Sequence, residues 1–357
     1  MTDRRLIVHV LFPDKFTVPI IGYLRRAFGD AYDQRFLCVT GVGLPDELHR
    51  TQETVILRNP HRRHLRHNTI LVHRLFREAD RVILHGLPLM YYLILFPWVL
   101  RKSFWIIFGS SDLTSSIETG SAWLRRSRTF VIRRIYGHLT HLREDSELVN
   151  QTFGATGTHV YSPVYRSNVV AQVEIPARAP RPAELHVLVG NSTSPSNRHA
   201  PVLHQLAALN IDGLHVHCPL SYGAFPAYKA EVVALGRRLF GERFHPLTDF
   251  MPLEDYQRFL GSIDAAIFNH PHQEAMGVTI SLLSMGKKVF AYPDTTAFRS
   301  LRSRGFELFD NRTLSEAALR APFDPTRNRA RCQQFYSSQA LHEGWLATYT
   351  HPLTSTK

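Results

Sequence analysis

A run of small hydroxyl and amide residues follows a short apolar stretch in the middle of the chain. The stretch Val187–Val189 predicts a buried strand, and residues 190–198 predict a loop that leads into a helix. Backbone N–H groups and uncharged polar side chains beside the positive end of a helix can hold a phosphate or pyrophosphate. The same residue types also serve as ordinary helix N-caps, so a purely structural turn is the alternative. The side chains that we expect to bind phosphate are those of Asn191, Ser192, Ser196 and Asn197, with Arg198 as an additional cation.

A second polar loop, residues 269–275, ends another predicted strand and precedes another predicted helix. Its order of strand, Glu274, Gly277, helix and next strand resembles the donor-binding layout of GT-B glycosyltransferases. This resemblance implies that Gln273 and Glu274 hold ribose or sugar hydroxyls, while N–H groups of the helix end at Gly277 face the pyrophosphate. An ordinary turn between a strand and a helix is the alternative. Leu282 stands where many retaining members of that class carry a second acidic residue, which favours an inverting enzyme.

Short apolar runs alternate with amphipathic segments along the chain, which predicts parallel sheets with crossover helices. A proline-rich connector, 174–183, separates two such halves. We therefore expect an α/β fold with two Rossmann-like domains that face a central cleft, and the resemblance described above implies that this fold is of the GT-B type. The first would span 1–173 and the second 184–325, with a helical tail over 326–357 that can pack on the first domain. In such sheets, ligands lie at the carboxyl ends of the strands.

The predicted elements divide between the two halves. The strands of the first half are predicted at Leu6–Phe12, Phe36–Thr40, Thr54–Leu57, Val82–Leu84, Phe104–Phe108, Leu139–Leu142 and His159–Tyr161. The strands of the second half are predicted at Leu185–Val189, Leu214–His217, Phe244–Pro246, Ala265–Phe268 and Lys288–Ala291. The helices are predicted near 17–29, 65–79, 87–101, 121–137, 144–153, 199–209, 225–240, 252–261 and 276–286, with a helical tail over 326–349.

The composition is that of a globular protein with an unusual excess of positive charge. The chain has 357 residues, 44% hydrophobic and 20% charged, and a formal net charge of +12. That charge favours anionic partners, but the sequence has no zinc-finger spacing or aromatic RNA-binding signature, so we do not expect nucleic acid. Three separated cysteines and an N-terminus without the apolar core of a signal peptide favour a reduced, cytoplasmic protein. No Asp-x-Asp metal signature occurs, and we predict no metal and no cofactor.

Several motifs in both halves together resemble one narrower family. They are Leu188–Ser192, Ser196–His199, Pro219–Gly223, Asp255–Tyr256 and the Gln273–Gly277 loop, with His85–Gly86, Phe104–Trp105, Gly109, Asp112–Leu113 and Ser162–Pro163 in the first half. The sequence resembles the 4-acetamido-4,6-dideoxygalactosyltransferases (N-acetylfucosaminyltransferases) of enterobacterial common antigen synthesis. The resemblance spans nearly the whole chain, closely in the second half and loosely in the first. It implies an inverting, metal-independent GT-B enzyme, peripheral on the inner membrane, that uses a dTDP-sugar donor and a lipid-linked disaccharide acceptor.

An inverting transfer needs a base for the acceptor proton and groups that hold the departing nucleotide diphosphate. Two candidates for the base, Asp112 and His85, follow predicted strands of the first half. His9 and Asp14, near the end of the first strand, are further candidates. All four can instead have structural roles. Around the leaving diphosphate we expect the residues of the first loop, joined by Tyr222 and Gly223 from the next strand end.

The most hydrophobic segment, Gly86–Lys102, is too short to span a membrane. As a helix its apolar part would be about 20 Å long, against about 30 Å for the hydrocarbon core, and Pro97 interrupts it. It is either a buried core helix or an element seated at the membrane interface. Basic clusters lie nearby, at 61–67 and in a predicted helix. In that helix we expect anionic lipid to contact Arg125, Arg126, Arg128, Arg133 and Arg134.

These features predict a glycosyltransferase that moves an amino-deoxy sugar from a dTDP-sugar to a polyprenyl-diphosphate-linked glycan. We expect it on the cytoplasmic face of the bacterial inner membrane, held there by its charge. One alternative keeps the fold and changes the nucleotide sugar and acceptor, as in capsule or lipopolysaccharide synthesis. Another is a non-catalytic module that binds nucleotide sugars.

Overall fold

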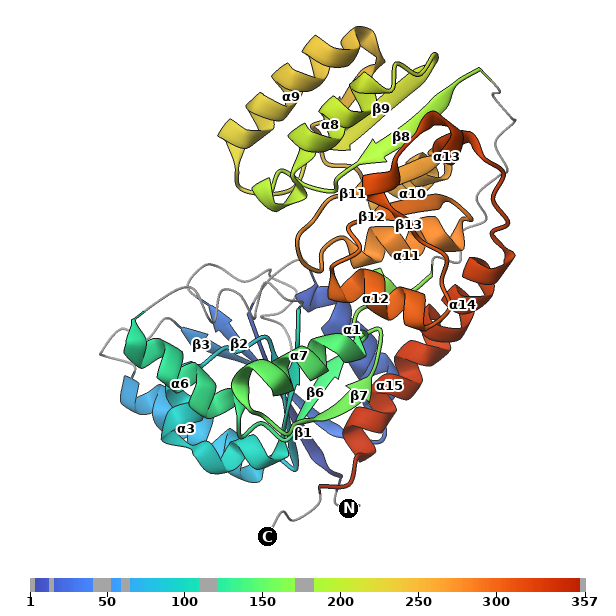
Figure 1. Ribbon diagram of the computed structural model, residues 1–357. Coiled ribbons are helices and arrows are strands. Elements are labelled where there is room, and N and C mark those ends of the chain that lie inside the picture. Colours follow the sequence, from blue (N-terminus) through green and yellow to red (C-terminus); the bar gives the residue numbers. More distant parts are fainter. Residues whose placement is uncertain are drawn as a thin grey trace. The chain divides into compact units, whose positions relative to one another are not determined.

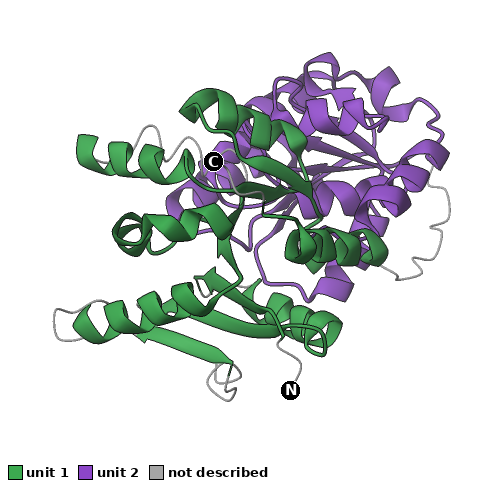
Figure 2. Cartoon of the chain, turned by 90° about the horizontal axis from the view of Figure 1, so that it is seen from below, with its two compact units in different colours: residues 1–167, 338–357 green, residues 168–337 purple. Residues whose placement is uncertain are grey.

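The computed structural model describes residues 4–12, 16–40, 53–58, 65–108, 121–170 and 183–353 (Figure 1). The chain divides into two compact units (Figure 2). The first unit comprises residues 1–167 and 338–357, and the second comprises residues 168–337. Most of the predicted connector lies outside the described residues. The predicted tail over 326–357 is shared between the units, because the chain returns to the first unit at Ser338.

The first unit contains a sheet of seven parallel strands in the order β3-β2-β1-β4-β5-β6-β7. The order reverses between β1 and β4, as in a Rossmann fold. The strands are β1 Leu6–Leu11, β2 Asp33–Thr40, β3 Thr54–Arg58, β4 Arg81–His85, β5 Ser103–Ile106, β6 Gly137–Thr140 and β7 Thr158–Tyr161. The helices are α1 Thr17–Phe28, α3 Leu65–Glu78, α4 Met90–Leu95, α6 Ala122–Ile132, α7 Arg143–Phe153 and α15 Ser338–Thr350.

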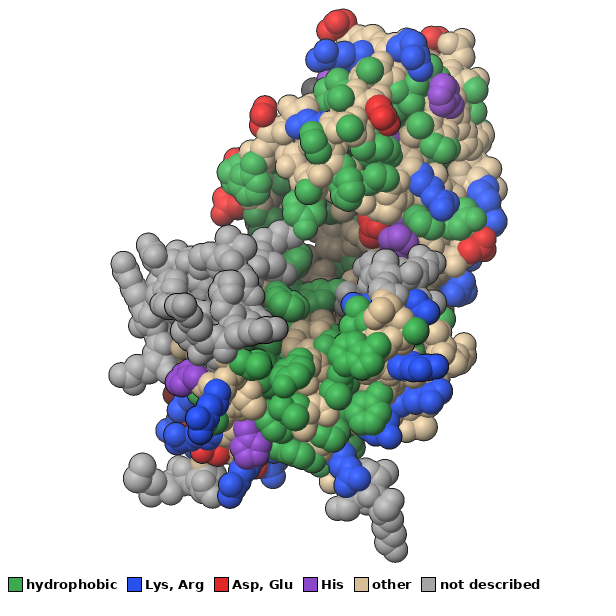
Figure 3. Space-filling view, turned by 90° about the vertical axis from the view of Figure 1, so that its left-hand side faces the viewer, with side chains coloured by type: hydrophobic (Ala, Val, Ile, Leu, Met, Phe, Trp, Pro, Cys, Tyr) green, Lys and Arg blue, Asp and Glu red, His purple; other side chains and the backbone are tan. Residues whose placement is uncertain are grey.

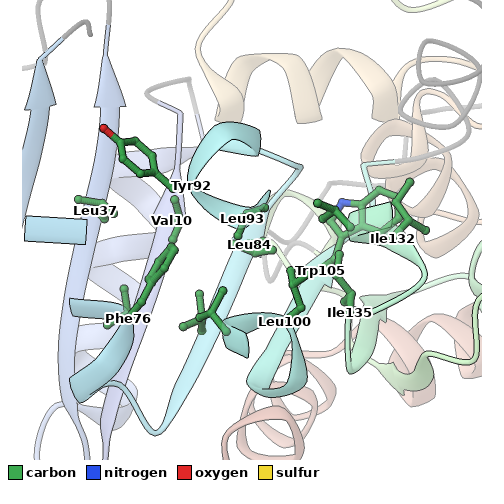
Figure 4. Close-up of a cluster of buried hydrophobic side chains, with 14 of the residues drawn as sticks. Val10, Leu37, Phe76, Leu84, Tyr92, Leu93, Leu100, Trp105, Ile132 and Ile135 are labelled. Carbon is green, nitrogen blue, oxygen red and sulfur yellow. The ribbon is translucent and has the colours of Figure 1, made fainter. Parts of the chain in front are cut away.

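Helices cover both faces of this sheet, so alternate residues of each strand enter two different cores. Val8 and Val10 of β1 join a cluster with buried side chains of α3, α4, α6 and α7 (Figure 4). On the opposite face, His9 lies against Phe36, Trp345 and Tyr349. The last two belong to α15, so this face is completed by a helix far along the chain from its strands.

The predicted helix over 87–101 is wrong, because the segment is broken. α4 ends at Leu95, and a 3₁₀ helix, η1, spans Pro97–Lys102. Phe96 between them has φ −121° and ψ 61°, since a residue before proline is restricted away from the α conformation. Within the described part of the chain, no helix has both the length and the apolar character needed to cross a membrane.

The second unit contains a sheet of six parallel strands in the order β10-β9-β8-β11-β12-β13. The order again reverses, here between β8 and β11. The strands are β8 Leu185–Val189, β9 Leu214–Pro219, β10 Phe244–Leu247, β11 Ala265–Phe268, β12 Lys288–Ala291 and β13 Phe309–Asp310. The helices are α8 His199–Ala208, α9 Pro226–Phe240, α10 Leu253–Gly261, α11 Met276–Ser284, α12 Thr296–Ser303, α13 Glu316–Arg320 and α14 Thr326–Tyr336.

Two helical layers enclose this second sheet. Buried residues of α8, α9 and α13 form one cluster with alternate residues of β8, β9 and β11. α11 and α14 pack together apart from that cluster, where the Cys332 thiol contacts the Ile280 carbonyl oxygen at 3.7 Å. The two sheets thus confirm the prediction of two Rossmann-like domains of α/β type.

Candidate functional site

The loops that follow β8 and β11 contact each other at the point where the strand order of the second unit reverses. Ligands of open α/β sheets bind at such a switch point, outside the carboxyl ends of the strands. Asn269 Nδ2, after β11, donates to the Arg198 carbonyl oxygen at 3.4 Å. Both predicted donor-binding loops therefore belong to one local structure.

Asn197 holds the loop after β8 together. Its Oδ1 accepts from the Asn191 backbone N–H at 2.7 Å, and its Nδ2 donates to Ser192 Oγ at 2.9 Å and to the Ser194 carbonyl oxygen at 3.2 Å. The side chain is 1% exposed. The Asn197 side chain therefore positions Asn191, Ser192 and Ser194, and Ser196 Oγ lies 2.7 Å from Ser194 Oγ.

His270, which the sequence analysis did not single out, ties the two loops together. Its Nε2 lies 3.1 Å from Asn191 Oδ1 and 3.1 Å from Asn197 Oδ1. Burial lowers the pKa of His270 to about 4, so the ring is neutral at physiological pH and donates from Nε2. The only sequence signal for this role was its place directly after a strand, in Asn269-His270-Pro271-His272.

Glu274 is a carboxylate at the edge of the same cluster. Its Oε1 accepts from His272 Nε2 at 2.7 Å, and Ser196 donates a further hydrogen bond. Burial alone would raise the pKa of Glu274, but the hydrogen bonds from His272 and Ser196 outweigh it and hold the pKa below its ordinary value. Ser196 and Glu274, predicted from separate loops, are therefore direct neighbours. Gln273 beside them is buried.

The loop after β9 contacts the loop after β8 through its backbone. Thr193 N–H donates to the Tyr222 carbonyl oxygen at 2.7 Å, and Thr193 Oγ donates to the same oxygen at 3.1 Å. Gly223 has φ +115°, and a Cβ there would lie 2.3 Å from Thr193 Oγ. This close approach requires glycine at position 223. Tyr222 is 56% exposed, so its side chain is accessible to a ligand.

Helix α11 begins at Met276, two residues after Glu274. Ala275 has φ +57°, which turns the chain into the helix, and no acidic residue lies in the first turn, which contains Gly277. The N–H groups of a first turn lack partners within the helix and carry partial positive charge. The arrangement places uncharged donors, a helix N-terminus and one carboxylate around the same strand ends. Such a set can bind a nucleotide diphosphate and its neighbouring hydroxyls.

A small cavity adjoins this cluster between α11 and α12. His270, His272 and Glu274 line one side, and Tyr292 and Phe298 line another. It combines a carboxylate with aromatic faces, which suits a flat or hydroxylated group next to a diphosphate.

His85, a predicted base, is buried in the first unit with both ring nitrogens engaged. Nε2 lies 3.1 Å from His9 Nδ1, and Nδ1 lies 2.8 Å from the Tyr165 hydroxyl. Burial lowers the pKa of His85 to about 3. A base needs an available lone pair and a pKa near the operating pH, so this geometry argues against His85 as the proton acceptor. His9 is fully buried and is also a poor candidate. Asp112 and Asp14 lie outside the described residues.

The predicted lipid-binding arginines lie on and just after α6. Arg125, Arg126, Arg133 and Arg134 line a shallow groove with Thr129 and Phe130. Ser121 caps the helix by accepting from the Leu124 N–H at 3.3 Å. Arg133 donates to the Phe153 carbonyl oxygen, and Arg134 lies 3.9 Å from the centre of the Phe130 ring, so these cations also have contacts within the protein. Arg128 is half-buried.

Comparison with known proteins gives one family and several structures. The chain matches the family model described as 4-alpha-L-fucosyltransferase glycosyl transferase group 56 over residues 26–332. A glycosyltransferase from Rickettsia africae has a TM-score of 0.71 at 13% identity, with 99% of this chain and 100% of that chain covered. Anabaena HepE in complex with UDP and glucose has a TM-score of 0.68 at 13% identity, with 98% and 100% covered. Sucrose-phosphate synthase from Thermosynechococcus elongatus has a TM-score of 0.64 at 11% identity, with 97% and 98% covered. These structures identify the fold as GT-B.

Proposed function

Because the chain belongs to the family of 4-alpha-L-fucosyltransferases, glycosyl transferase group 56, it is a glycosyltransferase, and we propose a specific donor and acceptor for it. The donor is a dTDP-activated amino-deoxy sugar of the 4-acetamido-4,6-dideoxygalactose type. The acceptor is a polyprenyl-diphosphate-linked glycan of bacterial surface polysaccharide synthesis. The motifs that resemble the N-acetylfucosaminyltransferases of enterobacterial common antigen synthesis support this choice.

One observation carries the proposal: the loops after β8 and β11 form a single hydrogen-bonded cluster beside the N-terminus of α11. Asn191 and Ser192 supply uncharged donors there, while Ser196 donates to Glu274, which supplies a carboxylate. Hydroxyl, amide and backbone N–H groups stabilise a departing diphosphate without a metal ion in the reaction. We expect Glu274 to accept hydrogen bonds from ribose or sugar hydroxyls.

The transfer is a single displacement at the anomeric carbon of the donor sugar. The acceptor oxygen forms a bond to that carbon while the bond from the carbon to the diphosphate oxygen breaks. The electron pair leaves with dTDP, and the acceptor proton passes to a base. We assign the base to Asp112, because both nitrogens of His85 are already engaged. The displacement inverts the anomeric configuration.

A uridine nucleotide is the second candidate for the donor. HepE, whose fold this chain shares, was solved with UDP and with UDP-glucose. A UDP-sugar would place the enzyme in a capsule or lipopolysaccharide pathway with the same fold and the same loops.

We propose that the first unit docks on the anionic inner surface of the bacterial inner membrane. Large side chains remain exposed on α3, α4, η1 and α6, among them Ile70, Tyr91, Trp98 and Trp123. In Figure 3, hydrophobic side chains gather in the lower part of the view, with Lys and Arg side chains on either side of them. Aromatic and basic side chains together favour a lipid interface, at about 1 kcal/mol per basic residue near an anionic surface.

A thermal-shift series with nucleotides tests the donor. We expect dTDP and a dTDP-sugar to raise the melting temperature of the full-length protein in proportion to the logarithm of their concentration, and UDP and GDP to do so only at higher concentrations. A larger shift with UDP would transfer the assignment to the second candidate. No shift with any nucleoside diphosphate would contradict the site in the second unit.

A further inference from the structure

The first unit has a cavity of its own at the carboxyl ends of β1 and β4, where its strand order reverses. The cavity measures about 150 Å³, and its walls are formed mainly by Leu11, Phe12, Ile20 and Phe108. Apolar cavities of roughly this size hold a benzene-sized ring in other proteins. Phe12 and Phe108 are 52% and 36% exposed, so aromatic faces also reach the surface at this cavity.

Among the described residues that line the cavity, His85, Tyr165 and Thr17 have polar side chains. The Thr17 hydroxyl donates to the Phe12 carbonyl oxygen at 2.9 Å, which links the first residue of α1 to the residue that follows β1. The other two are joined to each other by the 2.8 Å hydrogen bond between His85 Nδ1 and the Tyr165 hydroxyl. The cavity therefore combines apolar walls with one hydrogen-bonded pair.

The backbone that presents Tyr165 is strained. Val164 has φ +68°, a conformation that β-branched residues rarely adopt. It is held there from both sides, because its N–H donates to Ser162 Oγ at 3.0 Å and its carbonyl oxygen accepts from Trp345 Nε1 at 3.0 Å. Strain that the surroundings enforce in this way is concentrated at functional sites.

The ring of Tyr165 is fixed between aromatic neighbours. Its centre lies 5.6 Å from that of Phe108, with the rings nearly parallel at 14°, and 5.3 Å from that of Phe16. The residue is 7% exposed. The direction of its hydroxyl is therefore determined by packing before any ligand arrives, which lowers the entropic cost of binding.

A chain of hydrogen bonds extends from Tyr165 into the core. His85 Nε2 lies 3.1 Å from His9 Nδ1, and His9 Nε2 lies 2.7 Å from the Tyr349 hydroxyl. A neutral imidazole donates at one nitrogen and accepts at the other, so both hydrogen bonds of each histidine must run in the same direction. Tyr349 on α15 does not line the cavity. Whether its hydroxyl donates to His9 or accepts from it therefore determines whether the Tyr165 hydroxyl accepts from His85 or donates to it.

This series of hydrogen bonds orients the Tyr165 hydroxyl and does not hold an extra proton. Burial lowers the pKa of His85 to about 3 and the pKa of His9 well below its ordinary value, and the charge of His85 would lower the latter further. Both histidines are neutral at the pH of the cytoplasm. A buried, fully connected polar chain is rigid, and it specifies one arrangement of its members.

We propose that the cavity binds a sugar ring of the acceptor, that Tyr165 donates or accepts a hydrogen bond to a hydroxyl of that ring, and that His85, His9 and Tyr349 are positioning residues for Tyr165. The sugar is a neutral pyranose, whose apolar face suits Phe12 and Phe108 and whose hydroxyl suits the hydrogen-bonded pair of His85 and Tyr165. The acceptor role rests on the proposed function.

Substitution of Tyr165 by Phe tests the binding step in the full-length enzyme. Tyr165→Phe keeps the ring between Phe16 and Phe108 and removes only the hydroxyl. We expect KM for a water-soluble acceptor glycan to rise about tenfold, the upper range for loss of one neutral hydrogen bond, with the affinity for dTDP unchanged. The matched control is Tyr92→Phe, because Tyr92 is similarly buried on the opposite face of the sheet and its hydroxyl has no hydrogen-bond partner among the residues that the structure describes. An acceptor KM within twofold of wild type for Tyr165→Phe would overturn the assignment.

Tyr349→Phe tests the positioning role at the end of the hydrogen-bonded series that is farthest from Tyr165. We expect a threefold to fivefold rise in acceptor KM, with kcat and dTDP affinity within twofold of wild type. An effect on kcat and dTDP affinity without one on acceptor KM would overturn the positioning role, because a general loss of stability does not act on the acceptor alone.

Direct binding separates this inference from the proposed function. The probes are methyl glycosides of common hexoses and N-acetylhexosamines, measured by saturation-transfer NMR without any donor. At least one should bind the wild-type protein and the Tyr92→Phe variant equally and bind Tyr165→Phe about tenfold more weakly. Binding of none of them, or equal binding to both variants, would overturn the inference even if dTDP binds the second unit. Failure of dTDP to bind, with this glycoside pattern intact, would instead contradict the donor proposal alone.

Discussion

At the scale of single residues, the donor cluster depends on neutral side chains that are placed by other neutral side chains. Asn197 is fully engaged with the loop after β8, and His270 connects that loop to the one after β11. Uncharged donors can hold a diphosphate by hydrogen bonds without neutralising its negative charge, as a cation would. In the proposed donor site, these uncharged groups would stabilise the leaving diphosphate without ion pairs.

Replacement of His270 by Phe tests this organisation. The change keeps a ring of similar shape but leaves Asn191 Oδ1 and Asn197 Oδ1 without their shared donor. We expect the affinity for dTDP to fall about tenfold and the free energy of unfolding to fall by about 1–3 kcal/mol, the cost of unsatisfied buried polar groups. Isothermal calorimetry and denaturant unfolding measure the two effects.

His204→Ala is the matched control for that substitution. His204 is an exposed histidine of α8 in the same unit, so both quantities should stay near their wild-type values. Equal nucleotide affinity in His270→Phe and wild type would show that the two loops do not depend on His270.

The residue types of the donor loops could be predicted from the sequence, but their partners could not. Asn, Ser and Glu after strands indicate a polar ligand site, and Ser196 and Glu274 are indeed neighbours. Whether Asn197 faces a ligand or the backbone depends on the turn geometry, which spacing does not encode. The role of His270 depends on its contact with Asn197, 73 residues earlier in the chain. The role of Tyr165 depends on its contact with His85, 80 residues earlier.

At the scale of elements, buried parallel strands were the most predictable part of the fold. Each predicted strand coincides with an observed strand to within a few residues, because strands buried on both faces are short, continuous apolar runs. α12, β13 and α13, between residues 292 and 325, were not predicted. β13 is only two residues long and α13 only five, so neither produces a periodic pattern.

Helix α6 is the element on which the membrane proposal can be tested. Arg125 and Arg126 are exposed on it. Because each basic residue near an anionic surface contributes about 1 kcal/mol, loss of these two weakens binding about thirtyfold, and reversal of their charge weakens it further. We expect Arg125→Glu with Arg126→Glu to release the protein from phosphatidylglycerol vesicles in a sedimentation assay, with activity on a water-soluble acceptor retained.

The same change of net charge elsewhere provides the control for α6. Arg237 and Arg238 are exposed at the end of α9 in the second unit, and their reversal to Glu should leave vesicle binding within about threefold of wild type. Equal loss of binding in both double variants would attribute the attraction to total charge and contradict a docking face on α6.

At the scale of the whole molecule, the first unit is built from two separate stretches of chain. α15 covers one face of its sheet, where Trp345 and Tyr349 are fully buried and Arg81 donates to the Thr348 carbonyl oxygen. A Cβ at Gly344 would lie 2.5 Å from Ser162 Cβ, so this helix approaches the strand ends very closely. The first unit therefore completes its core only after the second unit has been synthesised.

Buried histidines in both units make the stability of the whole molecule depend on pH. Burial lowers the pKa of His85 to about 3 and the pKa values of His138, His199 and His270 to about 4. An unfolded histidine titrates near pH 6.5. Below that pH the unfolded state binds more protons than the folded state, so stability is fully present above pH 6.5 and is lost as the pH falls towards 4.

We expect the free energy of unfolding to be nearly constant from pH 8 to 7 and to fall steeply between pH 6.5 and 4.5. At pH 4.5, each of the four histidines lowers the free energy of unfolding by about 2 kcal/mol relative to pH 7. Together these losses approach the total stability of a typical domain. Urea unfolding at several pH values gives the slope, which equals the difference in bound protons. His138→Phe should lower that slope by about one proton, because His138 is fully buried next to Trp105 and would no longer titrate on unfolding. A free energy of unfolding that does not change between pH 7 and 4.5 would mean that these histidines are protonated in the folded protein, and their neutral hydrogen-bonding roles in both sites would then be wrong.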